Sequence, residues 1–529
     1  MEIESQKTVC PVYYWAMRAP DRVAVAGSSS DITYSELNKL IEYVADCLIS
    51  YWKRDSAPTV GLVVSPTPSL DTLLAVLAVL RLGGRIALFN QRSGEVMAGM
   101  QAEVANVQLF DSSFIAEKVR ECQGVACRVP PLRSIVPEDT KSFSVQTLES
   151  SDIFDRKTCL IGDQTPSTGA ETAPTEWAPS GTLVIFTSGS EGAPRGVIHS
   201  SRTIKAHLQA STAALHLGPE ACWLVSLPCF HVGGLLIPLR IWWCGGRCIF
   251  PENLQRATLL ETLERYPFIS HLSLIPQMVE EMICLPTGPE LLRRCKAVLL
   301  GGAPLSLFLR RKLLNLQLPV WVGYGASEFC SHITLGQLSG TDGGAGYPIE
   351  GVSISFDADR RIGADFPALF LGYCGEKARE PGSVYWSSDF GEFGPDKELI
   401  IIGRRDRVII SGGEKINPEY IEEVVMRQLS ALGREHRCVV LGAPHPKWGE
   451  RPVLFVERGD VGEGTLSEWS IWEHEIQACI REIVACHLPG LLRPEIVIAI
   501  PQFPVAGPGK VAVPALREKY IYPFQFKMS

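Results

Sequence analysis

The chain has 529 residues, of which 46% are hydrophobic and 20% are charged. This length exceeds the usual size of one domain and the apolar content is sufficient for large cores, so the sequence predicts several packed units rather than a disordered chain. Fifty basic residues against 58 acidic residues give a formal net charge of −8, without an extended basic stripe. The charge balance therefore argues against a nucleic-acid-binding protein.

Cysteine spacing and apolar run length indicate the compartment. The 16 cysteines contain no Cys-x-x-Cys pair, which argues against a zinc ribbon or a redox motif. Residues 1–5 lack the apolar stretch of a secretory signal, and the longest apolar runs, 73–80 and 233–246, are shorter than the roughly 20 residues that span a bilayer. We expect a cytoplasmic protein without a membrane span, and these features do not specify its oligomeric state.

The first half of the chain alternates helix and strand patterns. Apolar periodicity predicts a helix over 33–50, a strand at 60–65, a helix at 71–82 and a strand at 86–89. This alternation is typical of βαβ units, so the sequence predicts an α/β fold with a parallel sheet. The strands predicted further along the chain, each followed by a helix-like segment, are 223–227, 269–275 and 297–300.

The rest of the chain departs from this alternation in two places. Residues 149–180 are rich in Ser, Thr, Pro and Gly, which predicts a mobile connector. From about residue 400 the pattern changes, with a charged junction at 403–407 and then a helix over 418–428. We therefore predict two unequal domains on a hinge: a large N-terminal domain, residues 1–404, and a small C-terminal α+β domain, residues 405–529.

A loop rich in hydroxyls and glycines, residues 187–196, follows a buried strand pattern at 182–186. Its backbone N–H groups and side-chain donors, with one cation, can surround an anion. It is not a Walker A loop, because it has no Gly-Lys-Ser/Thr and the residues after it look extended rather than helical. Taken alone, the loop fits two interpretations equally well: an anion-binding loop, or a flexible turn between two strands.

Further motifs follow in a fixed order, two of them after strand patterns at 297–300 and 320–322. They are Gly301-Gly302-Ala303-Pro304, Gly323-Tyr324-Gly325-Ala326-Ser327-Glu328, Trp386-Ser387-Ser388-Asp389, Gly403-Arg404, Ser411-Gly412-Gly413-Glu414 and Gly507-Pro508-Gly509-Lys510. In this order they resemble the adenylate-forming superfamily of acyl-CoA synthetases, peptide-synthetase adenylation domains and luciferases, over essentially the whole chain. The resemblance implies that ATP, with Mg²⁺, converts a carboxylate to an acyl-adenylate, from which the thiol of coenzyme A displaces AMP.

The resemblance also implies roles for single residues. Lys510, on the small domain, reaches the charge that develops during adenylation, and Glu328 ligates Mg²⁺, a hard ion suited to carboxylate oxygen. Asp389 accepts from the ribose hydroxyls, Arg404 donates to the same nucleotide, and Ser327 lies by the α-phosphate. The residues implied at the phosphates are Thr187, Ser188, Gly189, Ser190, Gly192 and Arg195. Those implied at the adenine are Gly301, Gly302, Ala303, Tyr324 and Gly325. After domain rotation, Gly412 and Gly413 are implied at the thiol.

Each of these residues also has an ordinary structural interpretation, such as a strand-end carboxylate, a turn cap or a solvated surface charge. The chain departs from the family pattern as well. Glu191 replaces a usual Thr, Arg195 a usual Lys and Pro508 a usual Ser, while Arg407 stands at a hinge position that usually holds Asp or Lys. No departure removes an indispensable group, but together they leave open a slow enzyme or a degenerate nucleotide binder.

The segment from Cys222 to Arg240 resembles the o-succinylbenzoate–CoA ligases of menaquinone and phylloquinone synthesis, apart from Gly233 where that subgroup usually has Ser. Their substrate has two carboxylates: one is activated, and a cation must hold the other. The available cations are Arg202, Lys205 and Arg240, of which we assign Arg240 to the substrate. We also assign His231 to the acyl pocket, and a hydrogen-bonded core histidine is its alternative.

The resulting prediction is an ATP-dependent acid–CoA ligase that forms 2-succinylbenzoyl-CoA from 2-succinylbenzoate. Its partners are then small molecules: a carboxylic acid, ATP and CoA. The alternatives in the same fold are another aryl or medium-chain acyl-CoA synthetase, or an adenylating enzyme that serves a carrier protein.

Overall fold

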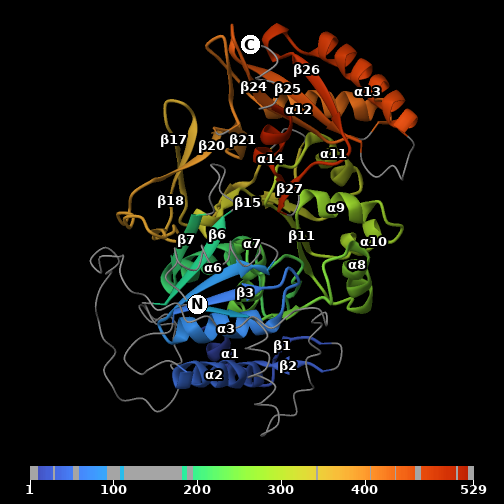
Figure 1. Ribbon diagram of the computed structural model, residues 1–529. Helices are drawn as coiled ribbons and strands as arrows, with labels where there is room; N and C mark the ends of the chain where they lie inside the picture. The colour runs from blue at the N-terminus through green and yellow to red at the C-terminus, as the bar shows by residue number, and fades with distance from the viewer. Residues whose placement is uncertain are drawn as a thin grey trace.

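The computed structural model describes residues 10–27, 30–51, 59–91, 108–111, 181–187, 195–340, 344–405, 407–434, 436–458, 466–507 and 510–521. Their strands form two large mixed sheets, a four-stranded sheet and a separate C-terminal sheet (Figure 1). The predicted connector at 149–180 lies outside the described residues. No helix among those that are described has the length and apolar character needed to cross a membrane.

The first large sheet has nine strands in the order β16-β15-β12-β11-β10-β8-β9-β1-β2. Its centre is parallel, as predicted, but β2, β15 and β16 pair antiparallel with their neighbours. No helical crossover separates β12 from β15, so the chain returns beside β12 in the opposite direction. The strands are β1 (Val23–Val25), β2 (Ile32–Thr33), β8 (Cys222–Leu224), β9 (Arg247–Ile249), β10 (His271–Leu274), β11 (Ala297–Leu300), β12 (Val320–Val322), β15 (Thr334–Gln337) and β16 (Tyr347–Pro348).

The second large sheet has six strands in the order β19-β7-β6-β4-β3-β5. Strands β3 to β6 run parallel, whereas β7 and β19 are antiparallel additions. The extended segment predicted after the Gly-rich loop is therefore confirmed as β7. The strands are β3 (Thr59–Val64), β4 (Arg85–Asn90), β5 (Gln108–Asp111), β6 (Thr182–Thr187), β7 (Arg195–Ser200) and β19 (Gly372–Tyr373).

Helices pack between and outside these sheets. Helix α3 packs on the six-stranded sheet, α7 packs on the nine-stranded sheet, and α6 joins them by packing on both β7 and α7. One large core therefore extends through both sheets. The helices of this part are α1 (Pro11–Arg18), α2 (Tyr34–Tyr51), α3 (Leu70–Arg81), α6 (Ser201–Ala214), α7 (Val232–Trp243), α8 (Arg256–Arg265), α9 (Pro276–Ile283), α10 (Gly288–Arg293) and α11 (Leu307–Asn315).

Local sequence signals explain where two predicted helices begin and end. Thr33 and Glu36 cap the start of α2 reciprocally: Thr33 N donates to Glu36 Oε2 at 2.8 Å, and Glu36 N donates to Thr33 Oγ1 at 3.2 Å. Helix α3 ends at Arg81, and Gly83 follows the cap residue Leu82 with a φ of +71°, the left-handed conformation that favours glycine. The next strand can then start two residues later.

Smaller elements cover the carboxyl edge of the large sheets. A four-stranded antiparallel sheet has the order β17-β18-β20-β21, and short elements follow β12. They are β13 (Gly325–Ala326), the 3₁₀ turn η2 (Ser327–Phe329), β14 (Ser331–His332), β17 (Ser353–Phe356), β18 (Arg361–Asp365), β20 (Tyr385–Phe393) and β21 (Leu399–Arg404).

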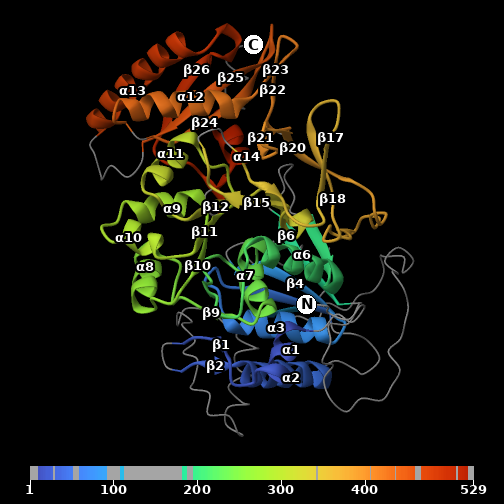
Figure 2. The same cartoon turned by 180° about the vertical axis from the view of Figure 1, so that it is seen from behind.

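The C-terminal elements form a unit with its own core, located at one end of the molecule (Figures 1 and 2). The chain changes sheet between β21 and β22, and the predicted boundary after residue 404 stays a proposal. The elements are β22 (Ile409–Ser411), β23 (Glu414–Ile416), α12 (Pro418–Ala431), β24 (Cys438–His445), β25 (Gly449–Glu457), α13 (Leu466–His487), η3 (Gly490–Leu492), β26 (Ile496–Ile500), β27 (Val505–Gly507), β28 (Lys510–Val511), α14 (Val513–Leu516) and η4 (Arg517–Ile521).

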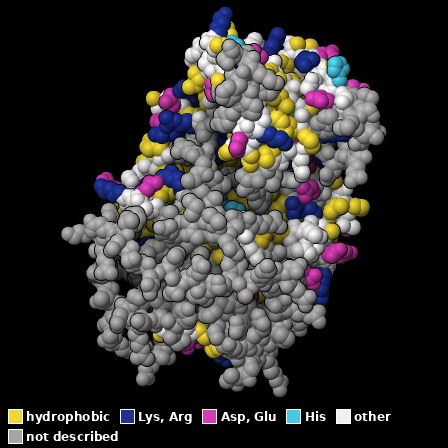
Figure 3. Space-filling model, in the orientation of Figure 1, with side chains coloured by type: hydrophobic (Ala, Val, Ile, Leu, Met, Phe, Trp, Pro, Cys, Tyr) yellow, Lys and Arg dark blue, Asp and Glu magenta, His cyan; other side chains and the backbone are white. Residues whose placement is uncertain are grey.

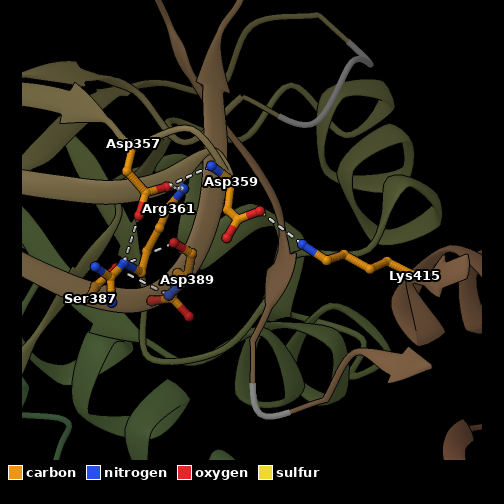
Figure 4. A network of polar contacts seen from close by, with 6 residues as sticks. All are labelled: Asp357, Asp359, Arg361, Ser387, Asp389 and Lys415. Carbon is orange, nitrogen blue, oxygen red and sulfur yellow. Dashed lines mark hydrogen bonds and ion pairs between the residues drawn. The ribbon is translucent and has the colours of Figure 1, made fainter. Parts of the chain in front are cut away.

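Several contacts join the C-terminal unit to the rest of the described chain, among them a hydrogen bond from Asn417 Nδ2 to the Ile402 carbonyl. Helix α12 packs against α11. In addition, Lys415 Nζ on β23 lies 2.9 Å from Asp359 Oδ1, in the turn between β17 and β18 (Figure 4). Both side chains of this ion pair are largely exposed, at 63% and 67%.

A partly buried ion-pair cluster lies at the predicted hinge. Arg407 Nη1 is 2.9 Å from Glu419 Oε1, and Arg407 Nη2 pairs with Glu422. Val440 N also donates to Glu422 Oε1 at 2.6 Å. Arg407, at the unusual hinge position, is therefore anchored on α12 of the C-terminal unit.

Glu422→Gln should remove a pH dependence of stability from the C-terminal unit. Burial first, partly offset by Arg407, raises the pKa of Glu422 from 4.5 to about 7. Since the folded state then holds a proton that the unfolded state releases, this residue's stabilisation is complete below about pH 4.5 and is lost as pH rises through about 7. Protection of α12 from hydrogen exchange, corrected for the intrinsic exchange rate at each pH from 5 to 8, should show this decline in the parent protein and not in Glu422→Gln. Glu482→Gln, an exposed change on α13, should keep the parent profile, and a parent profile in Glu422→Gln would refute the assignment.

Candidate active site

The predicted nucleotide residues follow the carboxyl ends of neighbouring parallel strands. Strands β11 and β12 pair Leu300 with Val322. Their ends bring the loop 301–303 beside the segment 324–328, at the edge where open α/β sheets bind ligands. A Cβ atom added at Gly301 would meet no heavy atom within 4 Å, so a flat group can approach this loop closely. The geometry is compatible with the proposed adenine contact.

Tyr324 links this edge of the sheet to Asp389, the carboxylate proposed to bind the ribose. Its hydroxyl donates to Asp389 Oδ2 at 2.6 Å and lies 3.1 Å from Ser387 Oγ. Burial first, and then the charge of Asp389, raise the pKa of Tyr324, so the hydroxyl stays a donor. Asp389 Oδ1 lies 3.7 Å from Arg404 Nε, because β20 and β21 pair these residues. Sequence reasoning placed Tyr324 at the adenine, and the structure adds that its hydroxyl orients Asp389. Figure 4 shows Asp389 beside Ser387.

Glu328, the proposed Mg²⁺ ligand, is held at two points. Tyr373 donates its hydroxyl to Glu328 Oε1 at 2.8 Å, and Phe370 N donates to the Glu328 carbonyl at 2.9 Å. Within the described parts of the chain, no three His, Cys, Asp or Glu side chains gather into a metal site. A single carboxylate nevertheless suits Mg²⁺, which keeps waters and binds one or two carboxylates together with substrate phosphates. Glu328 therefore fits the proposed ion.

Thr187 and Arg195 face each other at the two ends of the Gly-rich loop, because β6 and β7 pair them. Arg195 Nη2 lies 2.7 Å from Glu376 Oε1, and the guanidinium carbon lies 3.4 Å from the centroid of the Tyr373 ring. The Arg195 side chain is 45% exposed, so it remains accessible to a phosphate. The other predicted phosphate residues, which lie outside the described residues, are Ser188, Gly189, Ser190 and Gly192.

A histidine that sequence reasoning missed supports Ser327. His199, on β7, donates from Nε2 to the Ser327 carbonyl at 2.7 Å. Burial lowers the pKa of His199 to about 4, so the ring is neutral at neutral pH and its N–H remains directed at this carbonyl. The two residues are 128 positions apart, and no local pattern links them.

Arg240 lies inside the protein, on α7, with only 2% of its surface exposed. Its Nε donates to Ser211 Oγ on α6 at 3.0 Å, and its guanidinium carbon lies 5.4 Å from the Trp223 ring centroid. Burial lowers the pKa of Arg240 to about 10, which leaves it charged at neutral pH. No carboxylate in the described parts of the chain pairs with it. A bound anion would relieve the cost of burying this charge.

Two neutral histidines neighbour Arg240. Burial first and the charge of Arg240 second lower the pKa of both His207 and His332. His207 Nε2 donates to the His332 carbonyl at 3.1 Å, which leaves His207 Nδ1 and His332 Nε2 buried without a hydrogen-bond partner among the described residues. Such atoms mark a place for a ligand or water. The helical spacing of Thr203, His207 and Ser211 was the signal in the sequence that these side chains share a face.

The other candidates for the acyl pocket lie nearer the surface. His231 is half-buried at the start of α7, with its ring centroid 4.6 Å from that of Phe230. Arg202 is exposed and Lys205 is half-buried, both on α6. Of the three predicted cations, Arg240 alone is fully buried.

The C-terminal unit holds Lys510, which is proposed for adenylation, and Gly412 and Gly413, which are proposed for the second half-reaction. Gly412 and Gly413 form the two-residue turn between β22 and β23, with φ of +60° and +88°. Glycine adopts such a turn without strain. Lys510 begins β28, and only its backbone is described. The roles of all three residues stay proposals.

Residues 12–360 match the family of AMP-binding enzymes. The match covers well over half of the chain, and it includes the edge built by β11, β12 and η2. The chain belongs to this family.

Several relatives are bacterial 2-succinylbenzoate–CoA ligases. The chain is 32% identical to the one from Haemophilus influenzae over 282 residues, which are 52% of this chain and 59%, less than two thirds, of that protein. It is 30% identical to the one from Salmonella typhimurium over 347 residues, covering 64% of this chain and 71% of that protein. With the Lactococcus lactis protein it shares 27% identity over 444 residues, 82% of this chain and 86% of the relative.

Solved structures show the same fold. The o-succinylbenzoate CoA synthetase (MenE) from Bacillus subtilis, in complex with the acyl-adenylate intermediate OSB-AMP, matches with a TM-score of 0.74 at 19% identity, covering 97% of this chain and 98% of that one. ATP-bound MatB from Rhodopseudomonas palustris matches with a TM-score of 0.74 at 17% identity, covering 98% and 100%. The predicted adenylate-forming α/β fold is therefore confirmed.

Proposed function

We propose that the chain is an AMP-forming acid–CoA ligase that converts 2-succinylbenzoate to 2-succinylbenzoyl-CoA in menaquinone or phylloquinone synthesis, using ATP, Mg²⁺ and CoA. Membership of the AMP-binding family and the names of the relatives support the reaction class. The observation that carries the choice of acid is Arg240. A buried cation that has no carboxylate partner among the described residues suits the second carboxylate of a dicarboxylic acid better than an apolar acyl chain.

In the first half-reaction, a carboxylate oxygen of the acid attacks the α-phosphorus of ATP, and pyrophosphate leaves. Thr187 and Arg195 stand at the ends of the proposed phosphate loop, where a hydroxyl and a cation stabilise the developing charge. Glu328 would hold Mg²⁺, which neutralises phosphate charge when bound. Asp389, oriented by Tyr324, has lone pairs for the ribose hydroxyls.

In the second half-reaction, the sulfur of CoA attacks the acyl carbonyl carbon, and AMP leaves. We propose domains 1–404 and 405–529, with rotation about the hinge between the two steps. This rotation would withdraw Lys510 and bring Gly412 and Gly413 to the thiol. A turn made of two glycines presents backbone without side chains, which suits a narrow thiol channel.

Small-molecule partners, no nucleic acid and a cytoplasmic location remain parts of the proposal. Figure 3 shows Lys and Arg side chains interspersed with Asp and Glu over the described surface of one face, rather than gathered in a basic stripe. This distribution supports a protein that does not bind the phosphate backbone of a nucleic acid.

The test is pyrophosphate release with ATP, Mg²⁺ and a panel of acids, with and without CoA, and with products identified by mass spectrometry. We expect a CoA thioester from 2-succinylbenzoate and not from benzoate, cinnamate-type or medium-chain acids. Turnover of another acid alone would refute the substrate. Formation of acyl-adenylate without a CoA thioester would indicate a carrier protein as acceptor. Absence of pyrophosphate release with every acid, from a folded protein that binds ATP, would refute enzymatic activity.

A further inference from the structure

Tyr373 contacts two proposed site residues that come from different parts of the chain. Its hydroxyl donates to Glu328 Oε1 at 2.8 Å and lies 3.1 Å from the Tyr385 hydroxyl. The guanidinium carbon of Arg195 lies over its ring, 3.4 Å from the ring centroid. One side chain therefore touches both the proposed metal ligand and the proposed phosphate cation.

The sheet register places Tyr373 in this position. Strand β19 pairs antiparallel with β7, so Tyr373 lies opposite Val197 and diagonally beside Arg195. Diagonal neighbours across a strand pair are within reach of an aromatic side chain. The segment before β19 also binds the backbone of Glu328, because Phe370 N donates to the Glu328 carbonyl. Backbone and side chain of Glu328 are thus held by the same short stretch, 370–373.

The charges favour this arrangement. A tyrosine hydroxyl is protonated at neutral pH, so Tyr373 can donate to the Glu328 carboxylate. A cation on the face of a tyrosine ring is attracted by the ring electrons. Glu376 also holds Arg195, through an ion pair of 2.7 Å.

We propose that Tyr373 is a positioning residue that fixes the Glu328 carboxylate relative to the Arg195 guanidinium. It thereby sets the distance between the metal-binding and phosphate-binding groups before ATP arrives. The hydrogen bond occupies Glu328 Oε1 and leaves Oε2 for the ion. This inference rests on the proposed function only in taking Glu328 as the ligand of the Mg²⁺ that accompanies ATP.

The test separates the hydroxyl from the ring. Tyr373→Phe keeps the ring under Arg195 and removes the donor to Glu328, whereas Tyr373→Leu removes both. Loss of a hydrogen bond that orients a metal ligand typically weakens metal binding 10- to 100-fold. Mn²⁺ binding, followed by electron paramagnetic resonance with α,β-methylene-ATP, should therefore weaken by about 10-fold or more in Tyr373→Phe. The KM for the acid should not change, and Tyr373→Leu should add an increase in the KM for ATP.

Tyr14→Phe, a change on α1, is the matched control and should retain parent Mn²⁺ affinity. Parent Mn²⁺ affinity in Tyr373→Phe would overturn the proposal, and so would an equal loss in acid, ATP and metal binding, which indicates a merely structural role. Circular dichroism of Tyr373→Phe checks its fold. Failure of the parent protein to turn over any acid, with Mn²⁺ binding still dependent on Tyr373, would reject the proposed reaction and keep this assignment.

Discussion

Lys510→Ala should abolish acyl-adenylate formation while leaving thioester formation from supplied acyl-adenylate largely intact. Removing one group that stabilises developing charge typically costs about 10²- to 10³-fold in rate. Lys510 begins β28, and α14 follows it directly in the chain. Pyrophosphate release measures the first step, and conversion of synthetic acyl-adenylate with CoA measures the second.

Lys519→Ala provides the comparison for Lys510→Ala, because Lys519 is an exposed cation in the same C-terminal segment. It should leave both half-reactions at parent rates. Equal losses in both half-reactions of Lys510→Ala would show that the lysine acts on folding or on nucleotide binding in general, and its adenylation role would be wrong.

Arg240→Leu should change the acid that the enzyme accepts. Charge-assisted hydrogen bonds contribute roughly 1.5–3 kcal/mol, so kcat/KM for 2-succinylbenzoate should fall by about 10- to 150-fold. The matched acid 4-oxo-4-phenylbutanoate, which keeps the activated carboxylate and lacks only the ring carboxylate, should lose nothing, because it makes no contact that requires the cation. Since Arg240 has no carboxylate partner among the described residues, its removal strands no buried anion. Steady-state kinetics with the two acids in parallel is the measurement.

Arg202→Leu is the control for Arg240→Leu, since Arg202 is an exposed cation on α6. It should keep parent kinetics with both acids. If Arg240→Leu lost the same factor with both acids, Arg240 would be a structural residue of the α6–α7 contact, and the substrate assignment would have to move elsewhere.

Local sequence patterns were sufficient to predict the strands whose ends form the candidate active site. The strands at 297–300 and 320–322 are found at the residues predicted, because short buried runs ended by glycine leave little freedom of assignment. The strand predicted at 223–227 was too long, and it ends at Leu224. The predicted parallel sheet is confirmed for the central strands of the nine-stranded sheet and for β3 to β6 of the six-stranded sheet. The antiparallel strands at the remaining edges come from returning chain that carries no crossover helix.

Supporting residues of the site were beyond sequence reasoning. Tyr373 meets Glu328 across 45 positions, and His199 meets Ser327 across 128. These pairings arise from sheet register, which a local pattern does not encode. By contrast, motif order along the chain pointed to Asp389 and Arg404, which β20 and β21 do bring together. The roles of these residues, and of the Gly-rich loop, stay proposals.

The exposed ion pair between Lys415 and Asp359 has a consequence for experiments on this protein. An exposed pair is screened by dissolved salt, with a Debye length of about 8 Å at physiological ionic strength. Arg407, in contrast, is anchored inside the C-terminal unit by a shielded cluster that salt reaches poorly. Added salt should therefore weaken the Lys415–Asp359 pair between the two parts of the chain more than it weakens the Arg407 cluster within the C-terminal unit.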